Sequence, residues 1–202
     1  MPESRNKSQN VDGRRERSRS SRQRIVDAMM SLIASGEMTP SAARVAEEAG
    51  VGLRTVFRHF DDMDAIYAEI TATVSQQVLP IAMAPFPDGA WQDNVRELTH
   101  RRARAFEIML PFRLAAETRR YSSPLLLGQY AQVLHVEREL VLRQLPDAVK
   151  SHRITAESIC TCLSFQNWRT LRHDQQLTAE DAGSIIHHMI NSLIMAAEAI
   201  TD

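Results

Sequence analysis

The spacing of apolar residues is the feature that most constrains how this chain folds. From Gln23 onward these residues recur every three or four positions, which is the period of a helix buried on one side. No segment shows the sustained alternation of apolar and polar residues that a strand requires. The expected helices cover residues 23–35, 42–48, 53–59, 62–78, 90–110, 112–120, 124–145, 154–173 and 179–200. The sequence therefore predicts an all-α protein of about nine helices.

Proline and glycine mark where these helices are expected to end. Gly36 follows the first helix. Pro111, Pro124 and Pro146 stand between the later helices, because the interior of a helix does not tolerate proline well. The clearest break in the chain combines Pro80, Pro85, Pro87 and Gly89. We expect a linker at that break.

Charge is unevenly distributed along the chain, although the 202 residues carry a formal net charge of only −1. Residues 1–24 contain eight Lys or Arg residues and three acidic residues, so this segment is basic and the rest of the chain is acidic. Residues 1–20 are rich in Arg, Ser and Asn and almost free of large apolar groups, and we expect them to form a disordered basic arm. A basic arm on an acidic body predicts that the N-terminal part meets a polyanion.

Two further observations concern the cellular compartment of the protein. Cys160 and Cys162 are two positions apart and turn to different faces of a helix, so they cannot pair with each other. We interpret them as reduced thiols of a cytosolic protein, with a redox switch as the weaker reading. No apolar run reaches the roughly 18 residues of a membrane span, and no apolar stretch follows the basic N-terminus as in a secretory signal. We expect a cytoplasmic protein without a membrane partner.

The run SAARVAEEAGVGLRTVFRHF, residues 41–60, predicts a helix-turn-helix. Ala46 is small enough for a second helix to cross closely, and Gly50 stands where the turn needs a positive φ. The apolar residues expected to hold the two helices together are Val45, Ala49, Val51 and Val56. The residues expected on the outer face of the second helix are Leu53, Arg54, Thr55, Arg58 and His59. Such an outer face can reach phosphates and base edges of DNA.

The longer run TPSAARVAEEAGVGLRTVFRHFDDMDAIYAEI resembles the DNA-binding signature of the TetR family of transcriptional regulators, IAxxAGVSxGTxYxHFxxKexL. The close match covers Arg24 to Ile70. The rest of the chain resembles the family in length, in helicity and in the phrase LSFQNWRTLRHDQQLT. The resemblance implies a three-helix DNA-binding domain at residues 21–70. It also implies a helical effector-binding and dimerisation domain at residues 71–202.

The resemblance assigns DNA-binding roles to Arg44, Leu53, Arg54, Thr55, Phe57, Arg58 and His59. Arg54 and Thr55 are the candidates for base reading, whereas Arg44 and His59 are expected to meet the DNA backbone. Phe57 stands where the family usually has a tyrosine that bonds a phosphate, so the ring packing is kept and that bond is missing. Met63 replaces the lysine that the family prefers, and we expect the basic arm to compensate along the backbone or in the minor groove.

Three alternatives stay open for this segment. The apolar order alone is compatible with a three-helix bundle that has no DNA-binding role. The arm is alternatively a solvated tail, and His59 alternatively serves packing only.

Beyond the linker, the sequence offers no sign of enzyme chemistry. Residues 90–202 contain no glycine-rich phosphate loop, no metal-ligand spacing, and no Ser/His/Asp or Cys/His arrangement that spacing supports. His187 and His188 are adjacent, so they point about 100° apart on a helix and cannot chelate together. We expect neither an enzyme nor a cofactor nor a metal.

The last two helices are apolar on more than one side. In the segment 179–200 the apolar stripe is broader than one core contact requires, and such a helix must be buried on more than one side. Two copies packed into a four-helix interface would bury both sides, which agrees with the dimer mode of the resembled family. We expect a homodimer that holds its two recognition helices about one DNA turn apart over a palindrome.

A ligand site is harder to predict. Arg102 and Glu137 each lie in the middle of an apolar stripe, where a charge is costly unless it is paired. They form a structural bridge with each other, or they line a cavity and bind a polar group of a ligand, or the edge of the stripe meets solvent. The candidate ligand-binding residues are Trp91, Arg102, Phe106, Met109, Arg113, Tyr130, Glu137 and Asn167.

Together these expectations describe a repressor that binds double-stranded DNA and leaves its palindromic operator when an unknown small-molecule effector binds. The helix at 62–78 would transmit the change between the domains. The alternatives are a TetR-like DNA-binding protein without an effector and a helical enzyme that carries this DNA-binding segment.

Overall fold

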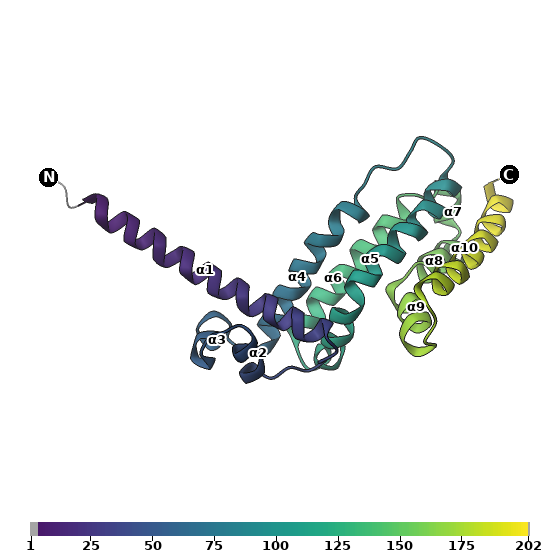
Figure 1. Cartoon of the computed structure of the whole chain (residues 1–202). Coiled ribbons are helices and arrows are strands. Elements are labelled where there is room, and N and C mark those ends of the chain that lie inside the picture. Colours follow the sequence, from purple (N-terminus) through teal and green to yellow (C-terminus); the bar gives the residue numbers. More distant parts are fainter. Residues whose placement is uncertain (1–3, 202) are drawn as a thin grey trace. The chain divides into compact units, whose positions relative to one another are not determined.

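The computed structural model describes residues 4–201 of the chain. These residues form ten α-helices and one π-helical segment, and no strand occurs among them. The helices are α1 (Ser4–Ala34), α2 (Ala42–Glu48), α3 (Leu53–His59), α4 (Met63–Ala82), α5 (Trp91–Arg120), α6 (Pro124–Leu142), α7 (Asp147–Ser151), α8 (Arg153–Cys162), α9 (Phe165–Arg169) and α10 (Ala179–Thr201). The π-helical segment covers Thr170–Asp174. The prediction of an all-α fold is confirmed (Figure 1).

The chain divides into two compact units. The first, called here the helix-turn-helix unit, comprises Met1–Thr73 and Pro111–Leu126. The second, called here the C-terminal unit, comprises Val74–Leu110 and Leu127–Asp202. The sequence predicted a boundary between residues 70 and 71, and the first segment of the helix-turn-helix unit ends at Thr73. The return of Pro111–Leu126 to the first unit was not expected, because sequence patterns do not show which distant helices pack together.

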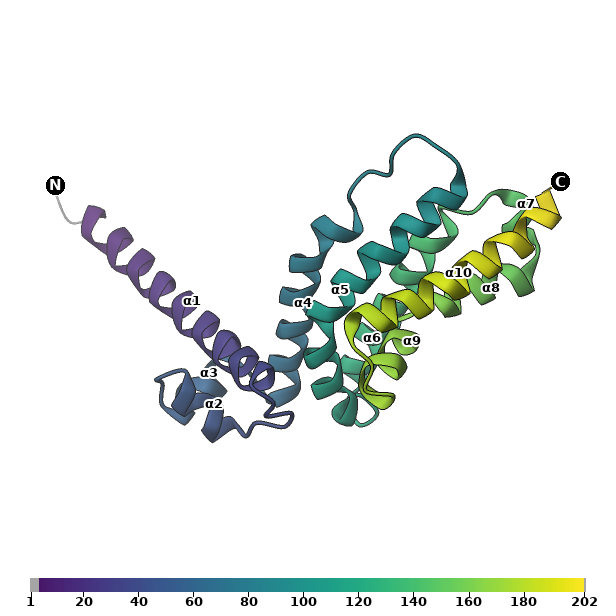
Figure 2. The ribbon, with the colours of Figure 1, turned by 45° about the vertical axis from the view of Figure 1, so that its right-hand side comes forward.

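In the helix-turn-helix unit, α2 and α3 lie against the C-terminal part of α1 (Figures 1 and 2). The completely buried side chains of this unit include Ile25, Met29, Ile33, Val45 and Val56. Gly50 has the predicted positive φ, at 62°, and Gly36, which was predicted to end the first helix, has a φ of 102°. Ser41 caps α2, since its hydroxyl oxygen accepts the backbone N–H of Arg44 at 3.2 Å. The predicted bounds of α3 and the burial of Val45, Ala49 and Val56 are confirmed, whereas Val51, also predicted to hold the two helices together, is only half-buried.

The first helix differs from its prediction at the N-terminal end. It was expected to begin near Gln23, but α1 begins at Ser4, so residues 4–20 are helical where a disordered arm was expected. The segment contains no proline, and its single Gly13 costs a helix only about 1 kcal/mol relative to alanine. Residues 1–3 of the expected arm lie outside the described residues.

Pro111 lies inside α5, so the prediction of separate helices at 90–110 and 112–120 is wrong. Proline lacks the N–H that the carbonyl of Glu107 would accept, but its fixed φ is compatible with a helix. Met109 and Ala115, on either side of it, are at most 7% exposed, and this burial offsets the missing bond. Pro80 likewise lies inside α4, so the break between helices is shorter than expected and falls after Ala82. At the other two sites, proline begins α6 and precedes α7, as predicted.

Two of the expected C-terminal helices are interrupted. The segment expected at 124–145 ends at Leu142. The segment expected at 154–173 is divided into α8, α9 and the π-helical segment. Ser164 begins a new helix there, because its hydroxyl oxygen accepts the backbone N–H of Asn167 at 3.3 Å. The last helix, α10, matches its prediction closely and lies beside α8 (Figures 1 and 2).

The core of the C-terminal unit lies between α5, α8, α9 and α10. Its most deeply buried large side chains include Leu98, Ile159, Leu163, Trp168, Ile190 and Ile194. Across the part of the chain that the structure describes, no helix is both long enough and apolar enough to cross a bilayer.

Candidate functional site

Helix α3 presents a mixed basic and apolar face. Arg54 and Arg58 are exposed, and beside them Leu53 and Phe57 are 46% and 49% exposed. These four positions share one side of the helix, whereas Val56 on the opposite side is fully buried. Thr55 is half-buried beside them. The ring of Phe57 is therefore less packed than the sequence predicts.

The orientation of α3 depends on Arg22 of α1. One guanidinium nitrogen of Arg22 donates to the backbone carbonyl of His59, the last residue of α3. Two others donate to the carboxylate of Glu69 at 2.9 and 3.3 Å. The guanidinium also lies 4.0 Å from the ring centroid of Phe60. A cation at a helix C-terminus satisfies a carbonyl that has no partner within the helix, so Arg22 ties three helices together at the end of α3. In the sequence, Arg22 stands out only as one member of a basic segment.

His59 lies partly inside the unit. Its Nε2 atom is buried and has no hydrogen-bond partner. Burial, and then the positive charges of Arg58 and Arg22, lower the pKa of the His59 imidazole below its ordinary value. The ring is therefore neutral near pH 7 and offers a DNA phosphate no full charge. This geometry favours the packing interpretation over a backbone contact.

Arg44 on α2 is surrounded by carboxylates. Its guanidinium nitrogens lie 3.5 Å from Glu37, 3.3 Å from Glu47 and 3.2 Å from Glu48. A DNA phosphate would have to displace these groups or accept their repulsion. Part of this arrangement was readable in the sequence, because Glu47 and Glu48 follow Arg44 at helical spacings of three and four residues.

The start of α4 is fixed inside the helix-turn-helix unit. Asp62 caps it, accepting the backbone N–H of Ala65 at 2.8 Å. The carboxylate of Asp64 accepts a hydrogen bond from Arg119 at 2.6 Å. The Tyr67 hydroxyl donates to the Met38 carbonyl at 3.3 Å, and burial raises the pKa of this hydroxyl. These contacts hold the first turns of α4 against α5 and against the loop between α1 and α2.

In the C-terminal unit, Arg102 joins three elements. It is 7% exposed, and its guanidinium donates to the backbone carbonyls of Glu137 in α6 and Leu163 at the end of α8. Next to it, the rings of Phe106 and Phe165 meet edge to face with centroids 5.5 Å apart. A buried guanidinium bound to two carbonyls is a structural brace. The contacts therefore favour the structural reading of the Arg102 and Glu137 positions.

The eight candidate ligand-binding residues do not share one environment. Arg102, Phe106 and Met109 are buried in the core of the C-terminal unit. Trp91, Tyr130, Glu137 and Asn167 are half-buried in the same unit, whereas Arg113 belongs to the helix-turn-helix unit. Tyr130 accepts a hydrogen bond from Gln166, and Asn167 donates to the Cys162 carbonyl at 2.8 Å.

An open groove of about 670 Å³ runs over the surface that α8, α9 and α10 form. Its lining residues are Glu157, Ser158, Thr161, Cys162, Asn167, His188, Met189, Ser192 and Leu193. Of the eight candidates, Asn167 is the one in this lining. Burial raises the pKa of the Cys162 thiol to about 11, so this cysteine is an inert neutral group.

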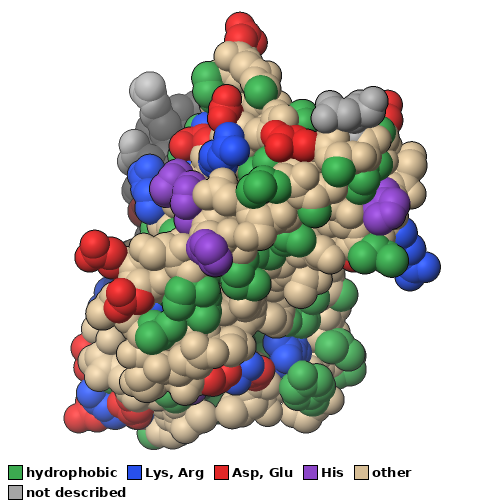
Figure 3. All heavy atoms as spheres, turned by 90° about the vertical axis from the view of Figure 1, so that its right-hand side faces the viewer, with side chains coloured by type: hydrophobic (Ala, Val, Ile, Leu, Met, Phe, Trp, Pro, Cys, Tyr) green, Lys and Arg blue, Asp and Glu red, His purple; other side chains and the backbone are tan. Residues whose placement is uncertain are grey.

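The same surface is rich in exposed apolar side chains (Figure 3). On α10, Ile185 and Met189 are about two-fifths exposed and Met195 is 71% exposed, while Ile154 at the start of α8 is 76% exposed. The opposite stripe of α10 is buried and contains Ala182, Ile186, Ile190, Ile194 and Ala197. The prediction that α10 is apolar on two sides is confirmed, although only one of these sides is covered within the chain.

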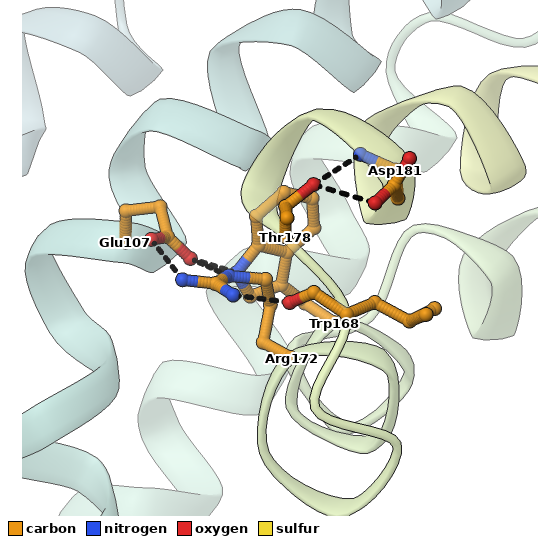
Figure 4. A network of polar contacts seen from close by, with 6 residues as sticks. Glu107, Trp168, Arg172, Thr178 and Asp181 are labelled. Carbon is orange, nitrogen blue, oxygen red and sulfur yellow. Dashed lines mark hydrogen bonds and ion pairs between the residues drawn. The ribbon is translucent and has the colours of Figure 1, made fainter.

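A polar network that the sequence did not predict fastens the π-helical segment to α5 (Figure 4). The carboxylate of Glu107 accepts the indole N–H of Trp168 at 2.9 Å and two guanidinium N–H groups of Arg172 at 2.8 and 3.0 Å. Arg172 also donates to the carbonyl of Leu177. The bonds from Arg172, and to a smaller extent the bond from Trp168, lower the pKa of Glu107 against the opposing effect of burial. No spacing rule pairs residues this far apart in the sequence.

Among the described residues, no cluster of three or more His, Cys, Asp or Glu side chains is arranged to hold a metal ion. Both cysteines are free thiols.

Comparison with known proteins identifies the fold. A transcriptional regulator from Rhodococcus sp. Rha1 is similar with a TM-score of 0.64 and 17% identity over 89% of this chain and 96% of that chain. The multidrug binding protein EbrR, solved in complex with imidazole, is similar with a TM-score of 0.59 and 22% identity over 83% of this chain and 88% of that chain. No protein-family model and no curated protein matches the sequence. The architecture is thus an N-terminal helix-turn-helix followed by a helical C-terminal domain, shared with these two solved proteins.

Proposed function

We propose that this protein is a TetR-type transcriptional regulator that acts in the cytoplasm as a DNA-binding homodimer. The observation that carries the proposal is the outer face of α3, where two exposed arginines lie beside two exposed apolar side chains on a short helix. The two solved proteins with a similar fold support it, since one is a transcriptional regulator and the other a multidrug binding protein. We assign DNA binding to residues 21–70, and effector binding and dimerisation to residues 71–202.

The chemistry of α3 suits the major groove. A guanidinium can bond both acceptors of a guanine edge, and an apolar side chain can contact the methyl group of thymine. Arg54 and Arg58 supply the first kind of contact, and Leu53 and Phe57 the second. Thr55 supplies a hydroxyl near the start of the helix. Arg44 and His59 have smaller roles in this proposal than the family resemblance implies, because one faces carboxylates and the other is partly buried.

The dimer forms through α8 and α10. Exposed apolar side chains on these helices leave a surface that water solvates poorly, and a second copy related by a two-fold axis covers it. A two-fold axis also duplicates α3, so the bound DNA is a palindrome with half-sites about 34 Å apart.

The regulator is a repressor that a small molecule releases from DNA. The effector binds the C-terminal unit and favours a state in which the two copies of α3 no longer fit adjacent grooves. To weaken operator binding tenfold, it must bind that state better by about 1.4 kcal/mol.

A second candidate is a DNA-binding protein of the same fold without an effector. The observation that favours it is the burial of Arg102, Phe106 and Met109, three candidate ligand-binding residues that fill the core. A thermal-shift screen against apolar small molecules separates the two candidates. A compound that raises the melting temperature and also releases DNA supports the effector, and a screen without such a compound supports the second candidate.

The proposal is tested by DNA binding. Fluorescence anisotropy at low ionic strength should detect tight binding of the purified dimer to double-stranded fragments from the promoter region of its own gene. A large excess of unrelated duplex DNA should be needed to displace the promoter fragment, because the affinity for a specific site typically exceeds that for nonspecific DNA by about 10³-fold or more. If those promoter fragments bind no better than unrelated duplex, the regulator assignment is wrong.

A further inference from the structure

Two histidines from distant parts of the chain meet between α5 and α10. The ring centroids of His100 and His187 are 5.7 Å apart, and the ring planes are inclined by 31°. His100 lies on the exposed side of α5, and His187 is half-buried on α10. Both belong to the C-terminal unit. Sequence spacing relates His187 only to its neighbour His188, so it does not reveal this pairing across helices.

The surroundings of the pair are polar. One helical turn before His100, Arg96 donates to the side-chain oxygen of Asn191 at 3.0 Å, and a further turn away Gln92 donates to Glu198 at 3.0 Å. Polar side chains therefore join α5 to α10 over three successive turns, and the histidines form the third contact of this series. A polar surface of this kind admits water and ions.

The separation of the rings fits a shared metal ion. Imidazole nitrogen binds Zn²⁺ at about 2.0–2.1 Å, so two imidazoles on one tetrahedral ion have ring centroids about 5.2 Å apart. The observed 5.7 Å exceeds this value by about half an ångström, which a small rotation of either side chain removes.

A second observation that points to a bound ion concerns His187. Its Nδ1 atom is buried and has no hydrogen-bond partner. A buried imidazole nitrogen without a partner is uncommon and calls for an explanation such as an ion or a water molecule. Coordination of a cation by Nδ1 would account for it, because an unprotonated imidazole nitrogen can give its lone pair to a metal ion in place of a hydrogen-bond donor.

Positive charge near the pair is partly neutralised. Arg96 lies 2.8 Å from the carboxylate of Asp93, and Arg101 lies 2.8 Å from that of Glu97. A further cation on α5 is Arg104, which is exposed and screened by water.

We propose that His100 and His187 form a two-histidine site for a divalent transition-metal ion that prefers imidazole, namely Cu²⁺, Ni²⁺ or Zn²⁺. Water completes the coordination, and the bound ion fastens α10 to α5. Affinity follows the order Cu²⁺ above Ni²⁺ and Zn²⁺, and Mg²⁺ does not bind, because Mg²⁺ prefers oxygen ligands. The site is independent of DNA binding.

The test is titration of the full-length, DNA-free protein with Cu²⁺, followed by electron paramagnetic resonance and calorimetry. The wild type should bind one Cu²⁺ per chain with a nitrogen signature from two imidazoles. His100→Ala and His187→Ala should each weaken this binding by about tenfold or more. His188→Ala is the matched control, since His188 is adjacent on the same helix but turned about 100° away, and it should bind like the wild type.

Thermal unfolding provides a second measurement that does not depend on spectroscopy. Zn²⁺ should raise the melting temperature of the wild type and of His188→Ala by a few degrees, and should leave the His100→Ala, His187→Ala double variant unchanged. Circular dichroism checks that the variants are folded. Binding that persists in the double variant, or that His188→Ala weakens as much as His187→Ala does, would overturn the proposal. Sulfur ligation in the spectrum would instead assign the ion to the cysteines and would also overturn it.

Discussion

Arginine has different roles in the two compact units. In the helix-turn-helix unit, Arg54 and Arg58 are exposed on α3 and available to another molecule. In the C-terminal unit, Arg101 and Arg102 are each 7% exposed and donate to backbone carbonyls of their own chain. The difference teaches that residue type alone does not distinguish a binding residue from a brace. A structural arginine differs from a binding arginine because its own chain already supplies hydrogen-bond acceptors for its guanidinium.

Arg22 and Arg44 refine this comparison, because both belong to the helix-turn-helix unit but face inward. Arg22 holds the last carbonyl of α3, and Arg44 faces three carboxylates. In this unit, therefore, some arginines bind groups of their own chain and others are exposed, and the proposed function assigns the exposed ones to DNA. Each of the following substitutions tests one side of this division.

The largest expected effect is on stability, in the C-terminal unit. Arg102→Met should lower the free energy of unfolding by about 3 kcal/mol, because two buried carbonyls lose a charged donor. Tryptophan fluorescence during chemical denaturation measures the change, since Trp91 and Trp168, the two tryptophans of the chain, belong to this unit. Arg104→Met, at an exposed position on the same helix, is the control and should change stability by less than about 0.5 kcal/mol. Equal decreases in the free energy of unfolding for the two variants would show that the hydrogen bonds of Arg102 do not stabilise this unit.

The next effect is on DNA affinity, in the helix-turn-helix unit. Arg54→Ala and Arg58→Ala should each lower operator affinity by about 10- to 100-fold and leave thermal stability nearly unchanged. Arg44→Ala should lower affinity by only about threefold, because its charge is already shared among three carboxylates. Anisotropy titrations at fixed salt compare the three variants. A larger decrease for Arg44→Ala than for Arg54→Ala would reverse the assignment of reading and structural arginines.

A smaller effect is expected from the arm. Deleting residues 1–20 removes six of the basic residues but keeps Arg22 and the buried part of α1. If the arm lies along DNA, the plot of log affinity against log salt should become flatter by about 0.9 for each phosphate that the arm neutralises in the full-length protein. A slope equal to that of the full-length protein would identify the arm as a solvated tail.

The smallest expected effect concerns Glu107 and pH. Its pKa is lowered in the folded state, so its contribution to stability is complete above the ordinary value and disappears as pH falls through the folded value. The carboxylate is about one-third exposed, and solvent screening limits the contribution to about 1 kcal/mol. The stability advantage of the wild type over Glu107→Gln should therefore shrink between about pH 5 and pH 3. A constant difference between the two proteins across this range would contradict the role of charge.

The sequence predicted the parts of the fold that neighbouring residues determine. Gly50 at positive φ and the buried Val45 and Val56 follow from local spacing, and all three are confirmed. Pro111 was misjudged because a proline rule describes an isolated helix and cannot include the burial on either side of it. The division of α8 from α9 depends on Ser164, a weak local signal inside an apolar stretch.

The candidate site shows the same limit. The exposed residues of α3 could be read from the sequence, since they lie on one short helix. The Arg22 contact with α3, the Arg102 brace and the Glu107 network join residues that are far apart in the chain, so spacing carries no information about them. The sequence predicted exposure where the exposed residues belong to one contiguous segment.

The way α3 is held has a consequence for how new specificities arise. A seven-residue helix is too short to persist alone, and here its persistence rests on Val56 inside and on Arg22 at its end. Leu53, Arg54, Phe57 and Arg58 take no part in that support. If the proposed function holds, all four can therefore be exchanged, by evolution or by an engineer, to change the DNA sequence that is recognised while the fold is kept.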